Sequence, residues 1–421
     1  MLAALARHHE VAIVGRLPAG AEPMGVGDLC VDVRVVRYRG VDHRTPLRCL
    51  LSASRRCFTP VPLLAQSRDA ELAAAVEEAI VAHRPRVVHL FNMYAAHYRR
   101  SDRPTVLDLP DIVSGLCESA ARARPMKYGA ARIQQRRVEL AERVLLRLVH
   151  PVTINDADTA RLRRLGIDAF MIPLAFALPE WSTTDSGSNP RPVAGRPLNL
   201  LFVGSYLHRP NLEAGCFLEQ RLVPALDACL RRSPVSWARC CRITIAGKAV
   251  RPLTRGPRRV ARLSGGRAGD CSEWSSECLA AAKYGGVEIV WRTDVPDLSS
   301  TYRQADIVIV PLAHGGGTKN KTLEAMAWGR PVVGTPEAFS GLGHKAARAC
   351  TVVPLDGVAM AQAILSLAGD PQAMARMGAA GRSYVAREHS QELVNRRVDA
   401  LYDAIAAGGG TADALRILDK G

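Results

Sequence analysis

A run of three glycines between a predicted strand and a predicted helix is the strongest chemical signal in the sequence. Gly315, Gly316 and Gly317 follow the apolar stretch 305–312, and a helix is predicted over 321–328. Glycines let a ligand approach the backbone closely. The unpaired N–H groups at a helix N-terminus attract anions. The segment therefore predicts a phosphate-binding turn.

Charged side chains beside the glycine run suit a nucleoside diphosphate. Lys319 and Lys321 add cations, and Glu324 follows Lys321 by three positions on the same helix face. A carboxylate there can accept hydrogen bonds from vicinal hydroxyls, such as those of a ribose. A P-loop is rejected because Asn320, not glycine, precedes the Lys-Thr pair. A structural glycine loop with a surface Lys–Glu pair remains the alternative.

The elements that must position these residues alternate between strand and helix. Apolar strands are predicted at 10–15, 86–91, 105–109, 151–154, 198–203, 242–246, 287–291, 305–312, 331–334 and 351–354. Continuous apolar strands separated by helices are typical of parallel sheets covered on both faces. The predicted fold class is therefore α/β, with two doubly wound units.

The predicted domains are 1–178 and 197–390. The segment 179–196 is rich in proline, serine and glycine, which indicates a linker. The stretch 251–286 is poor in apolar residues and is predicted to be a surface excursion.

Composition narrows the function classes. Lysine and arginine number 56 against 40 acidic residues, a formal net charge of +16, and 49 of the 56 are arginines spread along the chain. Aromatic residues are only 5 %, which argues against base-stacking nucleic-acid binders. No apolar run approaches the roughly 18 residues of a membrane-spanning helix, so a cytoplasmic location is expected. Eleven cysteines without a CxxC pair predict free thiols.

A predicted amphipathic helix over 130–149 combines apolar and basic residues. Its apolar stripe consists of Ile133, Leu140, Val144 and Leu148, and the surrounding arginines are Arg132, Arg136, Arg143 and Arg147. The arginines face either solvent or anionic lipid at the inner membrane face, and both interpretations stay open.

Four segments together resemble the group 1, retaining GT-B glycosyltransferases. They are GTKNKTLEAMAWGRPVVGTPEAFSGL at 317–342, the stretch 295–312 before it, FVGSYLHRPN at 202–211, and Asp108-x-x-Asp111-x-x-Ser114. The last is similar to a segment of an exopolysaccharide-type subgroup. The resemblance implies two Rossmann-like domains facing across a cleft, the first binding the acceptor and the second the nucleotide. The segment 391–421 would rejoin the first domain.

The resemblance also implies roles for particular residues. Lys321 would contact the donor diphosphate, and Glu324 the ribose hydroxyls. Further donor-binding residues would be Gly204, Lys248, Asp297, Gly315, Gly316, Gly317, Thr318 and Lys319. Asp108, Asp111 and His97 would serve the acceptor side as catalytic groups. For the two aspartates, capping of the next helix is the alternative.

The implied activity is transfer of a sugar, with retention, from a nucleotide-diphosphate sugar to a hydroxyl or amine. A UDP-sugar is the favoured donor, and a small molecule or a lipid-linked glycan the acceptor. Lysine and a helix dipole would replace a divalent metal, so neither metal nor cofactor is expected. Asp156-Ala-Asp158 is a D-x-D pair, but its place beside Asn155 predicts helix capping.

The sequence also departs from the family pattern. Gly316 replaces the first of two glutamates, Ser205 a basic residue, and Pro110 a histidine of the acceptor loop. The chain opens with a helix, without the strand and glycine loop that begin a doubly wound domain. This predicts a gene model that starts late, or else an inactive or partner-dependent subunit. A sugar-nucleotide epimerase of the same fold is a further alternative.

Overall fold

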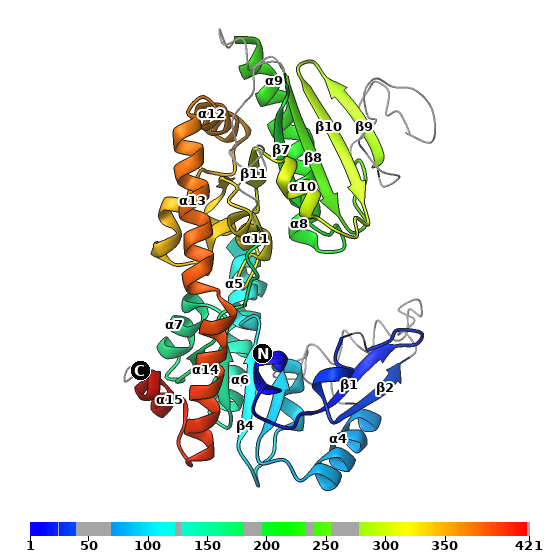
Figure 1. The fold of residues 1–421 in the computed structure, drawn as a ribbon, viewed down its shortest axis with the longest axis vertical. Helices are drawn as coiled ribbons and strands as arrows, with labels where there is room; N and C mark the ends of the chain where they lie inside the picture. Colours follow the sequence, from blue (N-terminus) through cyan, green and yellow to red (C-terminus); the bar gives the residue numbers. More distant parts are fainter. Residues whose placement is uncertain are drawn as a thin grey trace. The chain divides into compact units, whose positions relative to one another are not determined.

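The computed structural model describes most of the chain as two compact units. The described residues are 1–23, 25–38, 69–122, 128–180, 196–232, 240–253 and 278–418. Unit 1 comprises Met1–Ala175 and Gln391–Gly421, and unit 2 comprises Phe176–Ser390 (Figure 1). The predicted linker 179–196 lies mostly outside the described residues. Each unit is α/β with parallel strands, which confirms the predicted fold class.

Unit 2 is built on a seven-stranded sheet among the described residues, with the order β13-β12-β11-β7-β8-β10-β9. The strands are β7 (Leu198–Val203), β8 (Cys241–Gly247), β9 (Cys278–Tyr284), β10 (Val287–Thr293), β11 (Ile307–Val310), β12 (Val332–Gly334) and β13 (Cys350–Val352). The order reverses between β7 and β11, which is the topological switch point of a doubly wound sheet. Ligands of such sheets bind there, beyond the carboxyl ends of the strands.

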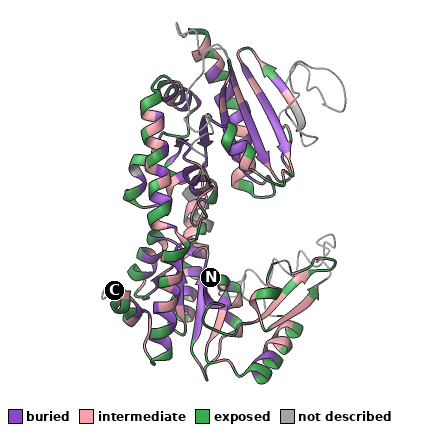
Figure 2. Cartoon of the chain, viewed as in Figure 1, coloured by how far each residue is buried: buried purple, intermediate pink, exposed green. Residues whose placement is uncertain are grey.

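The sheet of unit 2 is buried on both faces, as its continuous apolar strands predict. All four residues of β11 are fully buried, and Figure 2 shows β7, β8 and β10 largely buried as well. The flanking helical elements are α8 (Arg209–Phe217), η4 (Leu218–Leu222), α9 (Val223–Arg232), α10 (Ser299–Gln304), α11 (Asn320–Ala327), η6 (Pro336–Phe339), η7 (His344–Ala349), α12 (Gly357–Ala368) and α13 (Pro371–Glu388).

One strand of unit 2 differs from the sequence prediction. β9 lies within 251–286, which was predicted to be a surface excursion, and it pairs antiparallel with β10. Its sequence, CLAAAKY, is rich in alanine, which has little preference for strands. The pairing with β10 outweighs that weak local preference. Residues 254–277 lie outside the described part of the chain.

Unit 1 contains two parallel sheets, β1-β2 and β3-β4-β5-β6. The strands are β1 (Ala12–Pro18), β2 (Asp32–Tyr38), β3 (Val88–Phe91), β4 (Thr105–Leu109), β5 (His150–Thr153) and β6 (Phe170–Met171). The helical elements are α1 (Leu2–Leu5), η1 (Gly27–Leu29), α4 (Ala70–His83), η2 (Met93–Tyr98), α5 (Val113–Arg122), α6 (Tyr128–Leu146), α7 (Asp156–Arg164), α14 (Gln391–Ala406) and α15 (Thr411–Leu418). Among the described residues, β1 pairs only with β2, and β3 pairs only with β4. These pairings do not test the prediction that a first strand is missing, so it stays a prediction.

Helix α14 supplies part of the core of unit 1. Val398 and Leu401 pack with Val106 of β4 and Phe170 of β6 in one buried cluster. Arg397 donates a hydrogen bond of 2.8 Å from Nη1 to the carbonyl oxygen of Met171. Residues far apart in the sequence therefore complete one hydrophobic core.

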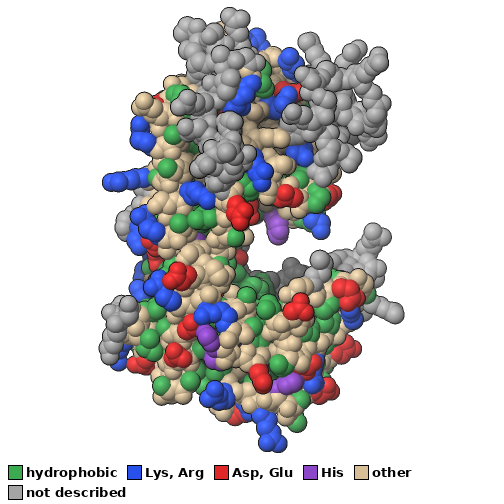
Figure 3. All heavy atoms as spheres, viewed as in Figure 1, with side chains coloured by type: hydrophobic (Ala, Val, Ile, Leu, Met, Phe, Trp, Pro, Cys, Tyr) green, Lys and Arg blue, Asp and Glu red, His purple; other side chains and the backbone are tan. Residues whose placement is uncertain are grey.

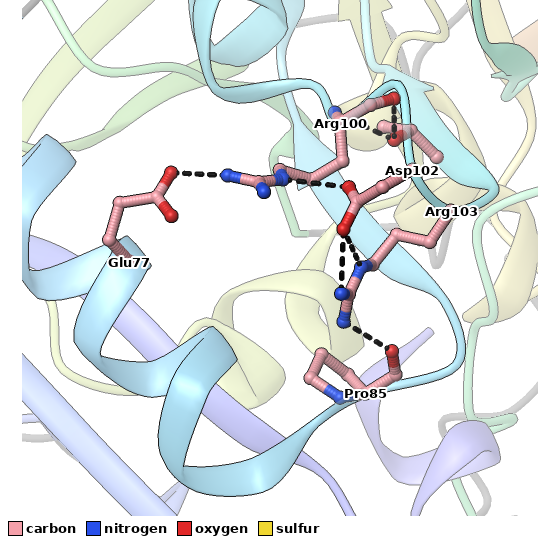
Figure 4. A network of polar contacts seen from close by, with 6 residues as sticks. Glu77, Pro85, Arg100, Asp102 and Arg103 are labelled. Atoms are coloured by element: carbon pink, nitrogen blue, oxygen red, sulfur yellow. Dashed lines mark hydrogen bonds and ion pairs between the residues drawn. The ribbon is translucent and has the colours of Figure 1, made fainter.

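A network of ion pairs fastens α4 to the turn before β4 (Figure 4). Arg100 Nη1 lies 2.5 Å from Glu77 Oε1 on α4, and Arg100 Nε lies 2.9 Å from Asp102 Oδ1. Arg103 binds the other oxygen of Asp102 at 2.7 Å and donates to the carbonyl oxygen of Pro85 at 2.9 Å. Two guanidinium groups hold the pKa of Asp102 well below its usual value.

Helix α6 and the turn after it, which contains Leu148, present their apolar stripe to solvent. Ile133, Leu140, Val144 and Leu148 are all more than half exposed, whereas Val138 and Leu146 are buried. This is the reverse of the usual arrangement, in which the stripe of an amphipathic helix faces the core. On the face drawn in Figure 3, basic and acidic side chains are both present and mixed. No helix in the described part of the chain is long and apolar enough to span a membrane.

A close approach of α13 to the end of α11 predicts the effect of one substitution. A Cβ at Gly378 would overlap the carbonyl oxygen of Gly329. Gly378→Ala should therefore lower the free energy of unfolding by about 1–3 kcal/mol in urea titrations. Helix propensity alone would make the same change stabilising by about 1 kcal/mol, so a stabilised variant would contradict this packing. Ala379→Gly, at the exposed neighbouring position, is the control for helix propensity and should lower the free energy of unfolding by about 0.5–1 kcal/mol.

Candidate nucleotide-binding site

The turns after β7 and β8 contact each other at the carboxyl edge of the unit 2 sheet. The N–H of Gly204 donates to Ala246 O at 2.9 Å, and that of Tyr206 donates to Lys248 O at 2.9 Å. Gly247 has a φ of +148°, and a Cβ there would lie 2.5 Å from Gly204 O. Glycine is therefore required at 247, where the two backbones touch.

The glycine run after β11 is fixed by a buried ammonium group. Lys319 Nζ donates to the carbonyl oxygens of Gly316 at 2.9 Å and Gly317 at 3.0 Å. It also donates to Ser340 Oγ at 2.9 Å and forms an ion pair of 2.9 Å with Glu337. Only 7 % of the Lys319 side chain is exposed. Lys319 thus shapes the loop from within, and its predicted phosphate contact stays a prediction.

Two polar features of the same loop have no protein partner that satisfies them. Thr318 Oγ1 is buried without a hydrogen-bond partner. Helix α11 begins immediately afterwards, and no side chain caps its N-terminus at Lys319. Buried hydroxyls and the first N–H groups of a helix normally find partners in protein or ligand. An anionic ligand at this turn would supply hydrogen-bond acceptors for both the Thr318 hydroxyl and these N–H groups.

Lys321 occupies the first turn of α11 and is held by residues of the β7–α8 region. Its Nζ donates a short hydrogen bond to Asn211 Oδ1 and lies 4.9 Å from the centroid of the Phe202 ring. Burial, together with the charge of Lys319, lowers the pKa of Lys321 to about 7, while Glu324 acts in the opposite direction. The ammonium is therefore short of negative charge around it, which is the state that a bound anion relieves.

Glu324, one turn further along α11, is oriented by a buried tyrosine. Tyr302 Oη donates to Glu324 Oε2 at 2.8 Å, and burial raises the pKa of Tyr302 well above its usual value. The Tyr302 ring stacks on Trp328, with the ring centroids 6.4 Å apart. One carboxylate oxygen is fixed in this way, and the group keeps capacity to accept further hydrogen bonds.

The sequence prediction omitted two residues that organise this site. Asn211 links Gly204 to Lys321, because a Cβ at Gly204 would lie 2.8 Å from Asn211 Cγ. Tyr302 orients Glu324. Both residues belong to segments that carry the family resemblance, so the motifs themselves were the available signal.

Two other residues predicted to bind the donor, Asp297 and Lys248, are described by contacts or exposure that do not involve the glycine run. Asp297 Oδ1 accepts from the N–H of Ser299 at 2.9 Å and so stabilises the start of α10. Hydrogen bonding by Ser299, first through its side chain and second through this N–H, holds the pKa of Asp297 below its usual value. Lys248 is exposed. The roles predicted for both residues stay predictions.

The predicted acceptor-side residues all belong to unit 1. Asp108 is buried on β4, 4.0 Å from His89 Nε2, and His89 Nδ1 lies 2.6 Å from Tyr402 Oη. Burial raises the pKa of Asp108 to about 6 and lowers that of His89 to about 4. Asp111 precedes α5, and His97 is exposed on η2. Their catalytic roles stay predictions.

Alternatives involving capping and metal binding can be compared with the structure. Asp108 lies within β4, and the N–H of Ser114 at the start of α5 donates to Glu142 instead, at 3.0 Å. Asn155 Oδ1 accepts from the N–H of Asp158, and Asn155 Nδ2 donates to the Asp158 carboxylate, which confirms the capping interpretation of the D-x-D pair. The described residues contain no group of three side chains suited to a metal ion.

The strand order defines unit 2 as a doubly wound α/β unit with a candidate ligand-binding turn at its switch point. Comparison with known proteins relates this region to a family. Residues 197–370 match the family model described as Glycosyl transferases group 1. The region that carries the candidate site is therefore a group 1 glycosyltransferase domain, which confirms the resemblance seen in the sequence. No curated protein matches the chain by sequence.

Solved structures show the same fold over nearly the whole chain. Sucrose-phosphate synthase of Thermosynechococcus elongatus aligns with a TM-score of 0.55 and 17 % identity, over 91 % of this chain and 85 % of the other. HepE of Anabaena, solved with UDP and glucose, aligns with a TM-score of 0.54 and 14 % identity, over 96 % of this chain and 94 % of the other. A glycosyltransferase of Rickettsia africae gives 0.51 and 13 %, over 95 % and 99 %. At these identities the likeness establishes the fold.

The two lysines of the turn should respond differently to substitution. Lys319→Met leaves Glu337 and the glycine carbonyls without their buried cation, so unfolding free energy should fall by about 3 kcal/mol or more. Lys321→Met removes a cation whose burial is unfavourable, so it should leave the free energy of unfolding unchanged or raise it. Urea unfolding of the ligand-free variants measures both. Equal losses at the two positions would contradict this division of roles.

Proposed function

We propose that the chain is a retaining, metal-independent glycosyltransferase that moves a sugar from a nucleotide-diphosphate sugar to a hydroxyl or amine. The observation that carries this proposal is Lys321, an ammonium held between Asn211 and Phe202 at the switch point of the unit 2 sheet. A UDP-sugar is the preferred donor, a choice supported by HepE, which has this fold and was solved with UDP and glucose. The acceptor is a small molecule or a lipid-linked glycan.

The chemistry follows from where charge develops during transfer. As the bond from the sugar to the diphosphate breaks, positive charge grows on the sugar and negative charge on the departing diphosphate. Lys321 and the uncapped N-terminus of α11 are fixed positive groups at the proposed diphosphate position. Because they are ordered before the reaction, they stabilise this negative charge without reorganising. These groups would do the work of a divalent metal.

The nucleoside end of the donor is assigned to Glu324. Its carboxylate is held by Tyr302 and would accept hydrogen bonds from the two ribose hydroxyls. The close contact of Gly204 with Gly247 keeps the floor of the site free of side chains, which leaves room for phosphates. On the acceptor side, Asp108 is proposed as the carboxylate that binds the nucleophile, with Asp111 and His97 assisting.

Donor binding and turnover test the role of Lys321. UDP should raise the melting temperature of the wild-type chain, and product analysis with acceptor should detect a transferred sugar. Lys321→Ala should lower turnover by about 10²–10³-fold, the effect of losing one charge-stabilising donor. Lys345→Ala, an exposed lysine paired with Glu388, is the matched control and should leave turnover unchanged.

Several results would contradict this proposal. Unchanged turnover of Lys321→Ala would show that this ammonium does not stabilise the transition state. Conversion of the sugar nucleotide to an epimer in the absence of acceptor would favour an epimerase. A chain that binds no nucleoside diphosphate would favour a non-catalytic subunit.

The pKa of Lys321 predicts how donor affinity depends on pH. Above about pH 7 the free protein loses the Lys321 proton, whereas a bound diphosphate keeps the group protonated. Binding then takes up a proton, so affinity should fall as pH rises, approaching tenfold per pH unit. Calorimetry with UDP from about pH 6 to pH 9 measures the slope. Lys321→Met should abolish the slope above pH 7; a slope that survives this substitution would assign it to another group.

A further inference from the structure

The outer face of α6 in unit 1, together with Arg147 and Leu148 in the turn after the helix, combines aliphatic and basic side chains. Every described exposed residue from 133 to 148 is either aliphatic or arginine. The aliphatic members are Ile133 (63 % exposed), Leu140 (62 %), Val144 (58 %) and Leu148 (51 %). The basic members are Arg136, Arg143 and Arg147. We call these seven residues the α6 outer face.

The opposite side of α6 prevents the helix from turning this face inward. Val138 and Leu146 are buried, and Glu142, also buried, accepts the N–H of Ser114 at 3.0 Å. Glu139 binds Arg161 at 3.1 Å, which ties α6 to α7. Rotating α6 to hide Leu140 would expose Val138 and break both polar contacts. The exposure of the aliphatic residues is therefore set by the packing of unit 1.

The charges on this face select the kind of partner. Among the described residues, Arg136, Arg143 and Arg147 form no ion pair, and the face presents no exposed carboxylate. A second copy of the chain would place these arginines against one another, and like charges at an interface are unfavourable. A nucleic acid would be attracted by the arginines but would give the four aliphatic side chains no apolar partner. An anionic lipid surface accommodates both kinds of side chain.

We propose that the α6 outer face docks unit 1 on an anionic membrane surface, with α6 lying in the plane of the interface. The four aliphatic side chains enter the boundary between headgroups and acyl chains. The guanidinium groups remain at the level of the lipid phosphates, where each would strengthen binding about fivefold. This proposal rests on unit 1 alone and does not depend on the proposed transfer reaction.

Vesicle sedimentation of the full chain tests this inference. The probes are vesicles of phosphatidylcholine alone and of phosphatidylcholine mixed with phosphatidylglycerol. The wild-type chain should bind the mixed vesicles and not the neutral ones, and added salt should weaken binding. The double variants Leu140→Ser/Val144→Ser and Arg143→Gln/Arg147→Gln should each reduce binding at least tenfold. Val81→Ser, at an exposed valine of α4 in the same unit, should bind like the wild type.

The outcomes distinguish docking from its alternatives. Circular dichroism must first show that each variant keeps wild-type secondary structure. Binding that is absent, equal for both vesicle types, or unchanged in Leu140→Ser/Val144→Ser would overturn the proposal. Wild-type dimers in analytical ultracentrifugation that dissociate in the same double variant would assign the face to a second copy and overturn it as well. Donor affinity in solution should be the same for all these variants, which separates this test from that of the transfer reaction.

Discussion

One buried ion pair sets the geometry of the candidate site. Lys319 meets Glu337 and two glycine carbonyls inside the loop, so the loop acquires a fixed shape before any ligand binds. Because Glu337 already balances the charge of Lys319, the positive charge left for a ligand is that of Lys321. Lys319 therefore shapes the loop, and under the proposed function Lys321, two positions further along, would bind the ligand. The uncapped start of α11 adds the dipole of a helix to the same place.

Much of this site follows from the sequence, but the division between the lysines does not. Alternating strands and helices predict a doubly wound sheet, and glycines after two of its strands mark the switch point. Lys319 and Lys321 look equivalent in the sequence. They differ because Lys319 has the extended backbone of an N-cap residue, whereas Lys321 is in the first helical turn. Which carbonyls and carboxylates surround each ammonium depends on η6 and α8, which are remote from both in the sequence.

Unit 1 shows where periodicity is informative and where it is not. The spacing of Ile133, Leu140 and Val144 correctly predicts a helix with an apolar stripe. The spacing alone does not say whether that stripe faces the core or the solvent. The direction is decided by Val138 and by Glu142, whose carboxylate is drawn inward by the N–H of Ser114. Similarly, an aspartate near a helix start suggests a cap, yet Asp108 belongs to β4 and is buried beside His89. Burial of polar groups is a tertiary property that local patterns do not encode.

The discontinuity of unit 1 has a consequence for synthesis on the ribosome. Its core needs α14, whose residues emerge only after all of unit 2, Phe176–Ser390, has been translated. At typical translation rates that interval lasts roughly 10–40 s. During it the early half of the chain exposes the apolar surface around Val106 and Phe170, while unit 2 can already fold. Unit 1 therefore cannot complete its hydrophobic core until α14 has been synthesised, near the end of translation.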